Sequence, residues 1–173
     1  MKQLLIIHSY FSPADNLKQI YLDFVTSAKE TIRIVDYSFN MVELVDLLNK
    51  KQKEGVDVML ILDKSQEGGK SEKVALSKLD KNITVLFGES SKGKIIHDKF
   101  TIIDGKAVES GSWNYTEVAG LEDNQIDIIY SRKRALEFTK IFVHIYTRLN
   151  HSAKVPYYGE VWHLKSLNVK GLK

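Results

Sequence analysis

The sequence predicts an α/β fold with a mixed, largely parallel sheet and helices on both faces. Apolar runs of strand length alternate with segments of helical periodicity between residues 17 and 149, a pattern typical of strand–helix–strand units. Residues 56–62 form an almost continuous apolar run after Gly55, as expected of a strand buried on both faces. Asp104-Gly105 is a two-residue hairpin signal. The antiparallel pair that this turn predicts makes the sheet mixed.

The first expected elements are a helix, a strand and a second helix. Ser12 is the expected cap of the first helix, and apolar residues at helical spacing follow over residues 17–28. Residues 31–38 form the first expected strand. Asn40 and Glu43 have the spacing of a second helix cap, and an apolar stripe follows them.

The rest of the chain continues the alternation. After the strand at 56–62 we expect a short helix, a strand, the hairpin, one more strand and a long final helix. These elements span residues 72–79, 83–87, 97–110, 125–130 and 138–149.

Length and composition limit the classes of function. The 173 residues, 43% of them hydrophobic, suit one domain, taken as 1–173 with 151–173 as an aromatic and basic C-terminal tail. The chain has no cysteine, which excludes a thiolate nucleophile and a zinc–thiolate site. Its N-terminal aliphatic run of four residues is too short for a signal peptide or a membrane span. We therefore expect a cytoplasmic protein without a membrane span.

The net charge of +3 is mild for a protein that binds nucleic acid. Most basic clusters have the placement of solvated helix ends or loops. Lys92 and Lys94 differ because they directly precede His97. We expect these two side chains to meet a polyanion beside that residue.

Residues 97–114, HDKFTIIDGKAVESGSWN, carry the chemistry that the sequence predicts. His97, Lys99 and Asp104 have the spacing HxKxxxxD. Side chains two apart on a strand project to one face, so we expect the imidazole of His97 beside the ammonium of Lys99. A nucleophilic imidazole next to a fixed cation suits attack on a phosphodiester.

The hairpin predicted at Asp104-Gly105 would fold residues 107–110 back along the first strand. Gly111, Ser112 and Asn114, in the pattern GSxN, follow at once. Ser112 and Asn114 should therefore arrive near the end of the sheet that holds His97.

HxKxxxxD followed by GSxN resembles the signature of the phospholipase D superfamily, in particular its small single-motif bacterial-type endonucleases. The resemblance implies that His97 forms a covalent phosphohistidine and that Lys99 and Asn114 hold the phosphate oxygens. It implies chemistry without a metal or a cofactor. Ser112 is expected as a further phosphate donor, and Asp104 as a support of the turn. Trp113 and Tyr115 are expected to pack in the core.

The resemblance also implies a downstream acidic residue that orients the nucleophilic imidazole. The segment LEDNQID offers Glu122, Asp123 and Asp127, and its pattern does not match the usual placement. We expect Glu122 or Asp123 in this role.

A single motif supplies one imidazole, whereas the family's mechanism uses one to attack and another to protonate the leaving group. His163 has Lys165 two residues later, but Lys170 stands at the Asp position and no GSxN follows. We therefore expect a twofold homodimer with one composite active site.

Two other kinds of site are not supported. Gly69-Lys70-Ser71 resembles part of a phosphate-binding loop, but Lys64 occupies the position of its first glycine. The sequence contains no HExxH, no HxH and no cysteine, so no metal site is expected.

These observations predict a metal-independent phosphodiesterase that cleaves nucleic acid, with DNA as the first substrate, low sequence specificity, and RNA as a further possibility. One alternative is a phospholipase D or a phosphatidyl transferase that acts on lipid phosphodiesters. Another is a catalytically inactive member that binds nucleic acid.

Overall fold

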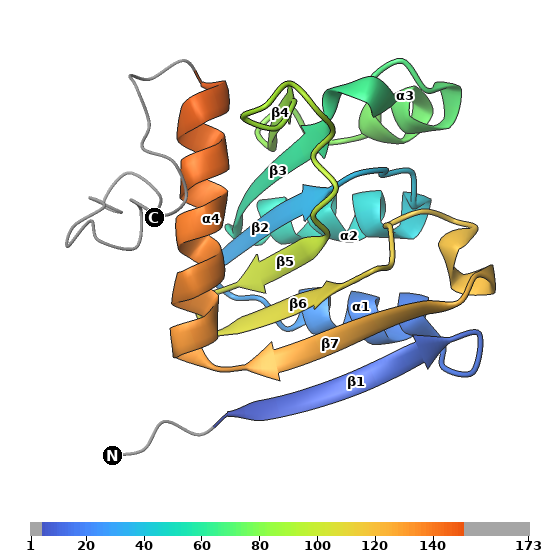
Figure 1. Cartoon of the computed structure of the whole chain (residues 1–173), viewed down its shortest axis with the longest axis vertical. Helices are drawn as coiled ribbons and strands as arrows, with labels where there is room; N and C mark the ends of the chain where they lie inside the picture. The colour runs from blue at the N-terminus through green and yellow to red at the C-terminus, as the bar shows by residue number, and fades with distance from the viewer. Residues whose placement is uncertain (1–4, 151–173) are drawn as a thin grey trace.

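A computed structural model describes residues 5–150, so the predicted tail at 151–173 lies outside the described residues. These residues form one seven-stranded sheet in the order β1-β7-β6-β5-β2-β3-β4 (Figure 1). The strands are β1 (Ile6–Ser12), β2 (Thr31–Asp36), β3 (Asp57–Asp63), β4 (Thr84–Gly88), β5 (Phe100–Ile103), β6 (Ala107–Gly111) and β7 (Asn124–Tyr130). The helices are α1 (Leu17–Thr26), α2 (Val42–Lys53), α3 (Lys70–Leu76) and α4 (Arg132–Leu149), with single 3-10 turns at Lys64–Gln66 and Ala119–Leu121.

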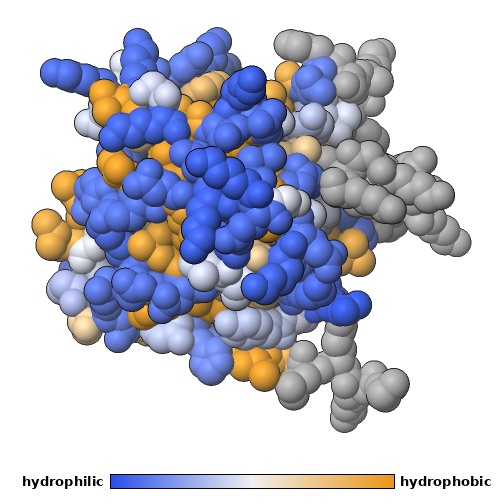
Figure 2. All heavy atoms as spheres, turned by 180° about the vertical axis from the view of Figure 1, so that it is seen from behind, coloured by the Kyte–Doolittle hydropathy of each residue, from blue (hydrophilic) through white to orange (hydrophobic). Residues whose placement is uncertain are grey.

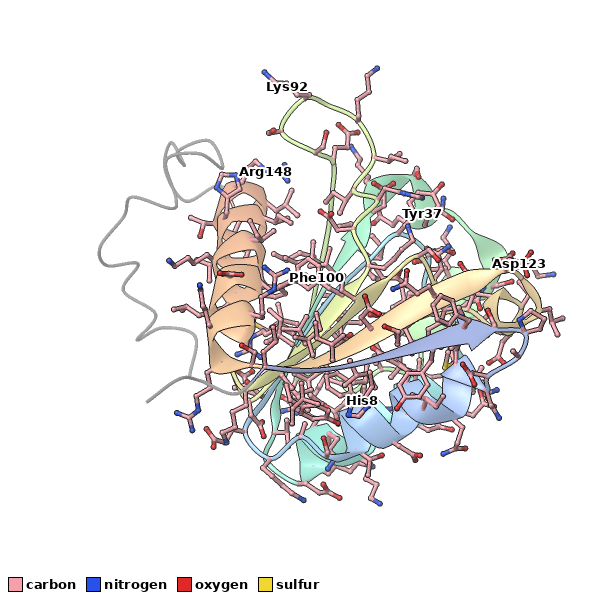
Figure 3. The ribbon with its side chains drawn as sticks, turned by 60° about the horizontal axis from the view of Figure 1, so that its bottom comes forward. His8, Tyr37, Lys92, Phe100, Asp123 and Arg148 are labelled. Carbon is pink, nitrogen blue, oxygen red and sulfur yellow. The ribbon has the colours of Figure 1, made fainter. Side chains whose placement is uncertain are left out.

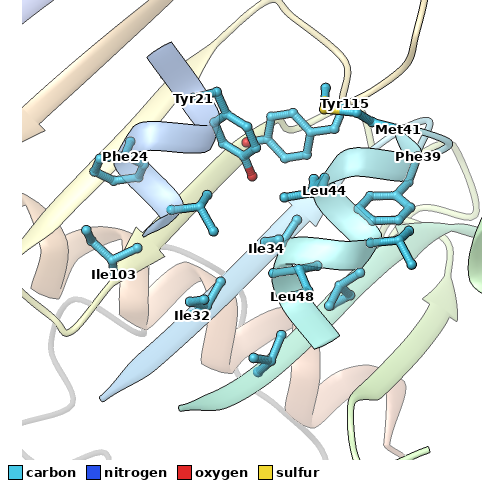
Figure 4. Close-up of a cluster of buried hydrophobic side chains, with 14 of the residues drawn as sticks. Tyr21, Phe24, Ile32, Ile34, Phe39, Met41, Leu44, Leu48, Ile103 and Tyr115 are labelled. Atoms are coloured by element: carbon cyan, nitrogen blue, oxygen red, sulfur yellow. The ribbon is translucent and has the colours of Figure 1, made fainter. Parts of the chain in front are cut away.

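Helices cover both faces of the sheet, as the sequence predicts. α1 and α2 pack on one face, and α4 crosses the strands on the other (Figure 1). Ile34 packs toward α1 and α2, in the larger cluster of buried side chains (Figure 4). Its neighbour Val35 packs toward α4, in a second cluster. Seen from behind, most of the outer surface is hydrophilic (Figure 2), as the solvent side of amphipathic helices should be.

The expectation of a largely parallel sheet is wrong. Only the pairs β2–β3 and β3–β4 are parallel, whereas β1–β7, β7–β6, β6–β5 and β5–β2 are antiparallel. Parallel neighbours need a crossover connection, usually a helix. The helix α2 connects β2 to β3, and α3 connects β3 to β4. From β5 onward a tight turn and an irregular loop join the strands, and neither imposes parallel pairing.

The strand β1 is an element that the sequence analysis missed. It lies at the edge of the sheet and pairs with β7 alone. Ser12 ends this strand instead of capping a helix: its hydroxyl donates to the carbonyl of Glu122 at 2.6 Å. Asn16 caps α1, because its side-chain oxygen accepts from the amide of Gln19 at 3.2 Å.

The cap predicted at Asn40 is also wrong. The side-chain oxygen of Asn40 accepts from the amide of Glu117 at 3.0 Å. In return, the carboxylate of Glu117 accepts from the amide of Val42 at 2.9 Å. A residue far along the chain therefore satisfies the first turn of α2, which local sequence patterns do not reveal.

Several chain segments meet at one end of the central strands. β2 ends there and β5 begins there, because Val35 pairs with Phe100 in an antiparallel register. Phe100 also pairs with Ser110, so β6 ends at the same end of the sheet. The residues before β5, after β6 and after β2 are thereby brought together, and these include the motif residues.

Candidate active site

His97 and Lys99 lie in the short segment that leads into β5, which begins one residue later at Phe100. The expectation that both stand within a regular strand is therefore wrong in detail. The expectation that they face the same way is supported, because both approach the ring of Tyr37. The rings of His97 and Tyr37 have centroids 5.1 Å apart, and Nζ of Lys99 lies 5.5 Å from the Tyr37 centroid.

The two motif residues differ in exposure. His97 is exposed, so a substrate can reach its imidazole. Lys99 is only 5% exposed, and its Nζ donates to the carbonyl of His97 at 2.8 Å. Burial lowers the pKa of Lys99, while the charges of Asp36 and Asp98 oppose that change. Lys99 is therefore a buried cation that is bound to the backbone of the residue with the exposed imidazole.

Asp104 closes the predicted hairpin at the opposite end of β5. Asp104 and Gly105 have φ values of 53° and 58°, the left-handed conformation that a tight two-residue turn of this kind requires. The Asp104 carboxylate accepts from the amides of Lys29, Glu30 and Thr31. Burial opposes its ionisation, but these amides outweigh burial, so the pKa of Asp104 lies below its ordinary value. Asp104 supports the fold, as the sequence analysis expects, and lies away from His97.

Gly111 allows β6 to lie close to β7. A Cβ atom at Gly111 would stand 2.0 Å from the carbonyl oxygen of Gln125, so only glycine fits. Ser112 then binds the start of β7: its hydroxyl donates to the side-chain oxygen of Asn124 at 2.9 Å and accepts from the amide of Gln125 at 3.1 Å. The only hydroxyl proton of Ser112 is thus committed to Asn124 in this structure.

Asn114 stands between two residues that are completely buried, Trp113 and Tyr115. These aromatic side chains pack with Tyr21 in the core, as the sequence analysis expects. The buried side-chain oxygen of Asn114 makes no hydrogen bond within residues 5–150. A buried side-chain acceptor without a donor is unusual in a folded protein.

The acidic residues expected to orient His97 do not contact it among the described residues. The carboxylate of Glu122 accepts from the side-chain nitrogen of Asn124 at 3.2 Å. Asp123 is exposed at the start of β7 (Figure 3). Asp127 accepts from the hydroxyl of Ser9. Their assignment to His97 stays a prediction.

Asp36 and Tyr37 are site residues that the sequence analysis did not single out. The carboxylate of Asp36, at the end of β2, accepts from the amides of Tyr37 and Tyr115, both at 2.9 Å. Burial raises the pKa of Asp36 well above its ordinary value, against the effect of these amides and of Lys99. An acidic residue at the carboxyl end of an apolar strand was the available signal, because such ends gather at one sheet edge.

Lys92 and Lys94 are exposed in the loop between β4 and β5. Lys92 lies at the far tip of this loop (Figure 3). The hydroxyl of Ser90 accepts from the amides of both lysines, which holds the tip in a compact turn. The loop that leads to His97 therefore exposes the ammonium groups of Lys92 and Lys94.

An open cleft of about 590 Å³ lies between His97 and α4. Its polar lining includes His97, Lys99 and Arg134, and its apolar lining includes Phe100 and Phe138. No group of three or more His, Cys, Asp or Glu residues within 5–150 is arranged to hold a metal ion. No helix in the same residues is long and apolar enough to cross a bilayer.

The fold and site define a class of α/β protein in which an exposed imidazole and a buried ammonium line one cleft where β5 begins and β6 ends. The family described as cardiolipin synthase, PLD-like domain, matches residues 21–146. The chain therefore belongs to the phospholipase D superfamily.

Two curated relatives agree with this membership. The phospholipase D of Rickettsia conorii is 27% identical over 134 residues, which cover 76% of this chain and 64% of that protein. The mitochondrial cardiolipin hydrolase of Chlamydomonas reinhardtii is 25% identical over 138 residues, which cover 78% and 60%. The chain thus spans less than two thirds of the length of these relatives.

Solved structures share the fold. Nuc from Salmonella typhimurium, a phospholipase D family member, superposes with a TM-score of 0.74 at 27% identity, over 80% of this chain and 92% of that one. NucT from Helicobacter pylori gives a TM-score of 0.73 at 18% identity, over 86% and 98%, which is a likeness of fold.

Proposed function

We propose that the chain is a metal-independent phosphodiesterase that cleaves nucleic acid, with DNA as its first substrate and little sequence specificity. The observation that carries the proposal is the approach of His97 and Lys99 to one ring, that of Tyr37. An exposed nucleophile is thereby held beside a buried cation. Such pre-organised charge stabilises the transition state of attack on phosphorus.

In the first step, a ring nitrogen of His97 attacks phosphorus, a P–N bond forms, and the P–O bond to the leaving oxygen breaks. Lys99 and Asn114 bind the non-bridging oxygens, on which negative charge develops. An imidazolium gives its proton to the leaving oxygen. Water then attacks phosphorus and breaks the P–N bond, while its proton passes to the imidazole that acted as the acid.

This mechanism needs a second imidazole, which we assign to His97 of a second copy in a twofold dimer. The other histidines among the described residues do not supply it: His8 lies on the edge strand β1, and His144 is buried in α4. Within residues 5–150, α4 is the helix on this face of the sheet, and the cleft beside His97 is open. A monomeric mass at micromolar concentration, together with full activity, would refute the composite site.

Nucleic acid is favoured over lipid by the placement of charge. Lys92 and Lys94 stand exposed on the loop before His97, where a polyanion that passes the site would meet them. The names of the curated relatives favour the second candidate, a phospholipase D or phosphatidyl transferase. A catalytically inactive nucleic-acid binder is less well supported, because His97, Lys99 and Asn114 are all present. The cytoplasmic location and the single domain over residues 1–173 stay predictions from the sequence.

The test is cleavage of supercoiled plasmid in excess EDTA by the wild type and by His97→Ala. Nicking by the wild type alone supports both the nuclease and its nucleophile. Because His97 is exposed, its removal should leave the fold intact, which circular dichroism can check. Activity that survives in His97→Ala would refute the assignment. Absence of nicking, together with release of headgroup from phosphatidylcholine or cardiolipin vesicles, would favour the lipid enzyme.

A further inference from the structure

Asp36 is a buried carboxyl group that belongs to neither half of the sequence motif. It is completely inaccessible to solvent and ends β2. Val35 pairs with Phe100 in the antiparallel register between β2 and β5. Continued by one position beyond the last paired residues, that register would set Asp36 opposite Lys99. Opposite charges at facing positions of neighbouring strands attract each other.

The Asp36 carboxylate also reaches the second half of the motif. One oxygen accepts from the amide of Tyr37 and the other from the amide of Tyr115, each at 2.9 Å. Tyr115 directly follows Asn114, and its carbonyl accepts from the amides of Asn40 and Met41, both at 3.1 Å. The backbone beside Asn114 is therefore fixed from two sides, and Asp36 forms one of these attachments.

We propose that Asp36 is a positioning residue that links the two halves of the motif. It fixes the backbone next to Asn114 through the Tyr115 amide, and it is the internal counter-ion of Lys99. This inference rests on the proposed function, in which Lys99 and Asn114 bind the same phosphate. A single carboxylate outside the motif then sets the distance between the two phosphate-binding groups.

The groups around this pair are mainly acidic. Lys99 is faced by Asp36 from β2, by Asp98 and His97 from its own segment, and by the ring of Tyr37. Removal of the Asp36 charge leaves Asp98, an exposed residue, as the other anion that acts on Lys99. The buried ammonium then loses the anion with the larger electrostatic effect on its pKa, in a weakly polarisable environment.

On the other side, Asp36 is faced by Glu72 from α3 and by Glu109 from β6. The phenols of Tyr21 in α1 and of Tyr115 also lie near it. The charge of Glu72 repels the Asp36 anion, whereas the charge of Lys99 favours the ionised form of Asp36. The charges of Asp36 and Lys99 should therefore depend on each other, which gives the proposal a direct readout.

The experiment is NMR titration of the Lys99 ammonium in the full chain, with labelled lysine and with Lys99→Arg to assign the signal. In Asp36→Asn the midpoint should fall by about one pH unit, a tenfold change in acid dissociation constant. Asp104→Asn is the matched control, since it removes the charge of another carboxylate that accepts from backbone amides, at the far end of β5. Its Lys99 midpoint should equal that of the wild type. If Asp36→Asn does not fold, Asp36→Ser removes the same charge with a smaller side chain.

Equal Lys99 midpoints in the wild type and in the folded Asp36 variant would overturn the proposal. This readout uses no substrate, so it stands apart from the proposed function. With bis(p-nitrophenyl) phosphate, the alkaline limb of kcat/KM should move to lower pH by the same amount. An NMR midpoint that falls while this limb stays in place would support the counter-ion and count against the role of Lys99 in catalysis.

Discussion

The ring of Tyr37 lies edge-on to the imidazole of His97, with centroids 5.1 Å apart and planes inclined by 60°. The hydroxyl of Tyr37 accepts from the side-chain nitrogen of Gln66 at 2.9 Å, which fixes the outer end of the ring. Tyr37 directly follows β2, a strand with neighbours on both sides. The core of the sheet, and not the motif alone, therefore sets the orientation of the nucleophile.

Replacement of Tyr37 separates the ring from its hydroxyl. Tyr37→Ala removes the surface against which His97 rests, and kcat/KM for bis(p-nitrophenyl) phosphate should fall about a hundredfold, the effect of a displacement near 1 Å. Tyr37→Phe keeps the ring and loses the hydrogen bond from Gln66, so the loss should be about threefold. Steady-state kinetics of both variants checks this. Equal losses would show that the hydroxyl, and not the ring, is the important group.

The exposed lysines of the β4–β5 loop should control salt dependence. Nucleic-acid cleavage should weaken steeply as salt rises, whereas hydrolysis of bis(p-nitrophenyl) phosphate should not. The double variant Lys92→Ala, Lys94→Ala should lower the slope of log(kcat/KM) against log[salt] for DNA by about two. The control is Lys50→Ala, Lys53→Ala, which changes the same charge at the end of α2. Equal slopes in both double variants would remove the loop from the substrate path.

Asp104 should contribute to stability mainly above acidic pH. Three backbone amides lose their acceptor in Asp104→Ala, which should lower the free energy of unfolding by about 2 kcal/mol at pH 7. The folded-state pKa of Asp104 is lowered, so this contribution is present above its ordinary value near 3.8 and is lost as pH falls through the folded-state pKa. Urea unfolding at pH 7 and at a series of pH values below 3.8 should show the difference between the two proteins shrinking as pH falls. A difference that is independent of pH would assign the effect to packing.

Much of the fold could be predicted from sequence because most elements carry their own periodicity. The stripe of α1, with Leu17, Tyr21 and Phe24, is buried as its spacing indicates. Pairing was harder, since it depends on contacts between distant segments. The strand β1 has six of its seven residues exposed or half-buried, so it shows no alternation. Without β1 and without the antiparallel pairs β6–β7 and β5–β2, the predicted sheet is more parallel than the observed one.

The site residues also form two groups: those that the sequence indicates and those that only the structure brings to the site. His97, Lys99 and Asn114 stand in one contiguous motif, so sequence alone could single them out. Asp36 and Tyr37 join them only because β2 pairs with β5, far away along the chain. Local patterns contain nothing about that pairing. The positions of Glu122 and Asp123 depend on an irregular loop, which explains why the pattern gave no clear choice between them.

Gly111 and Gly105 should respond differently to the same substitution. In Gly111→Ala the new Cβ would stand 2.0 Å from a backbone oxygen of β7, so β6 and β7 must separate, at a cost of about 3 kcal/mol. Because Ser112 and Asn114 follow, activity should be lost as well. Gly105→Ala meets no atom within 4 Å, but its φ is 58°, so the cost should be about 1 kcal/mol. Urea unfolding and kinetics together test the pair. An active, stable Gly111→Ala would contradict the close approach.

Glu109 should make the protein less stable as pH rises. Its side chain is completely buried, and burial raises its pKa from 4.5 to about 8 against the hydrogen bond from the Tyr115 hydroxyl. The folded state therefore binds more protons than the unfolded state between these values, so stability is greatest at the acidic end and falls as pH approaches 8. Glu109→Gln keeps an acceptor for Tyr115 and removes the titration. Urea midpoints of the wild type should decline between pH 5 and pH 8 relative to those of the variant.

Because Asp36 and Asp127 also repel a Glu109 anion, the decline should persist at high salt, where surface charges are screened and buried ones are not. Parallel midpoint curves for the two proteins would mean that Glu109 is already ionised in the folded state.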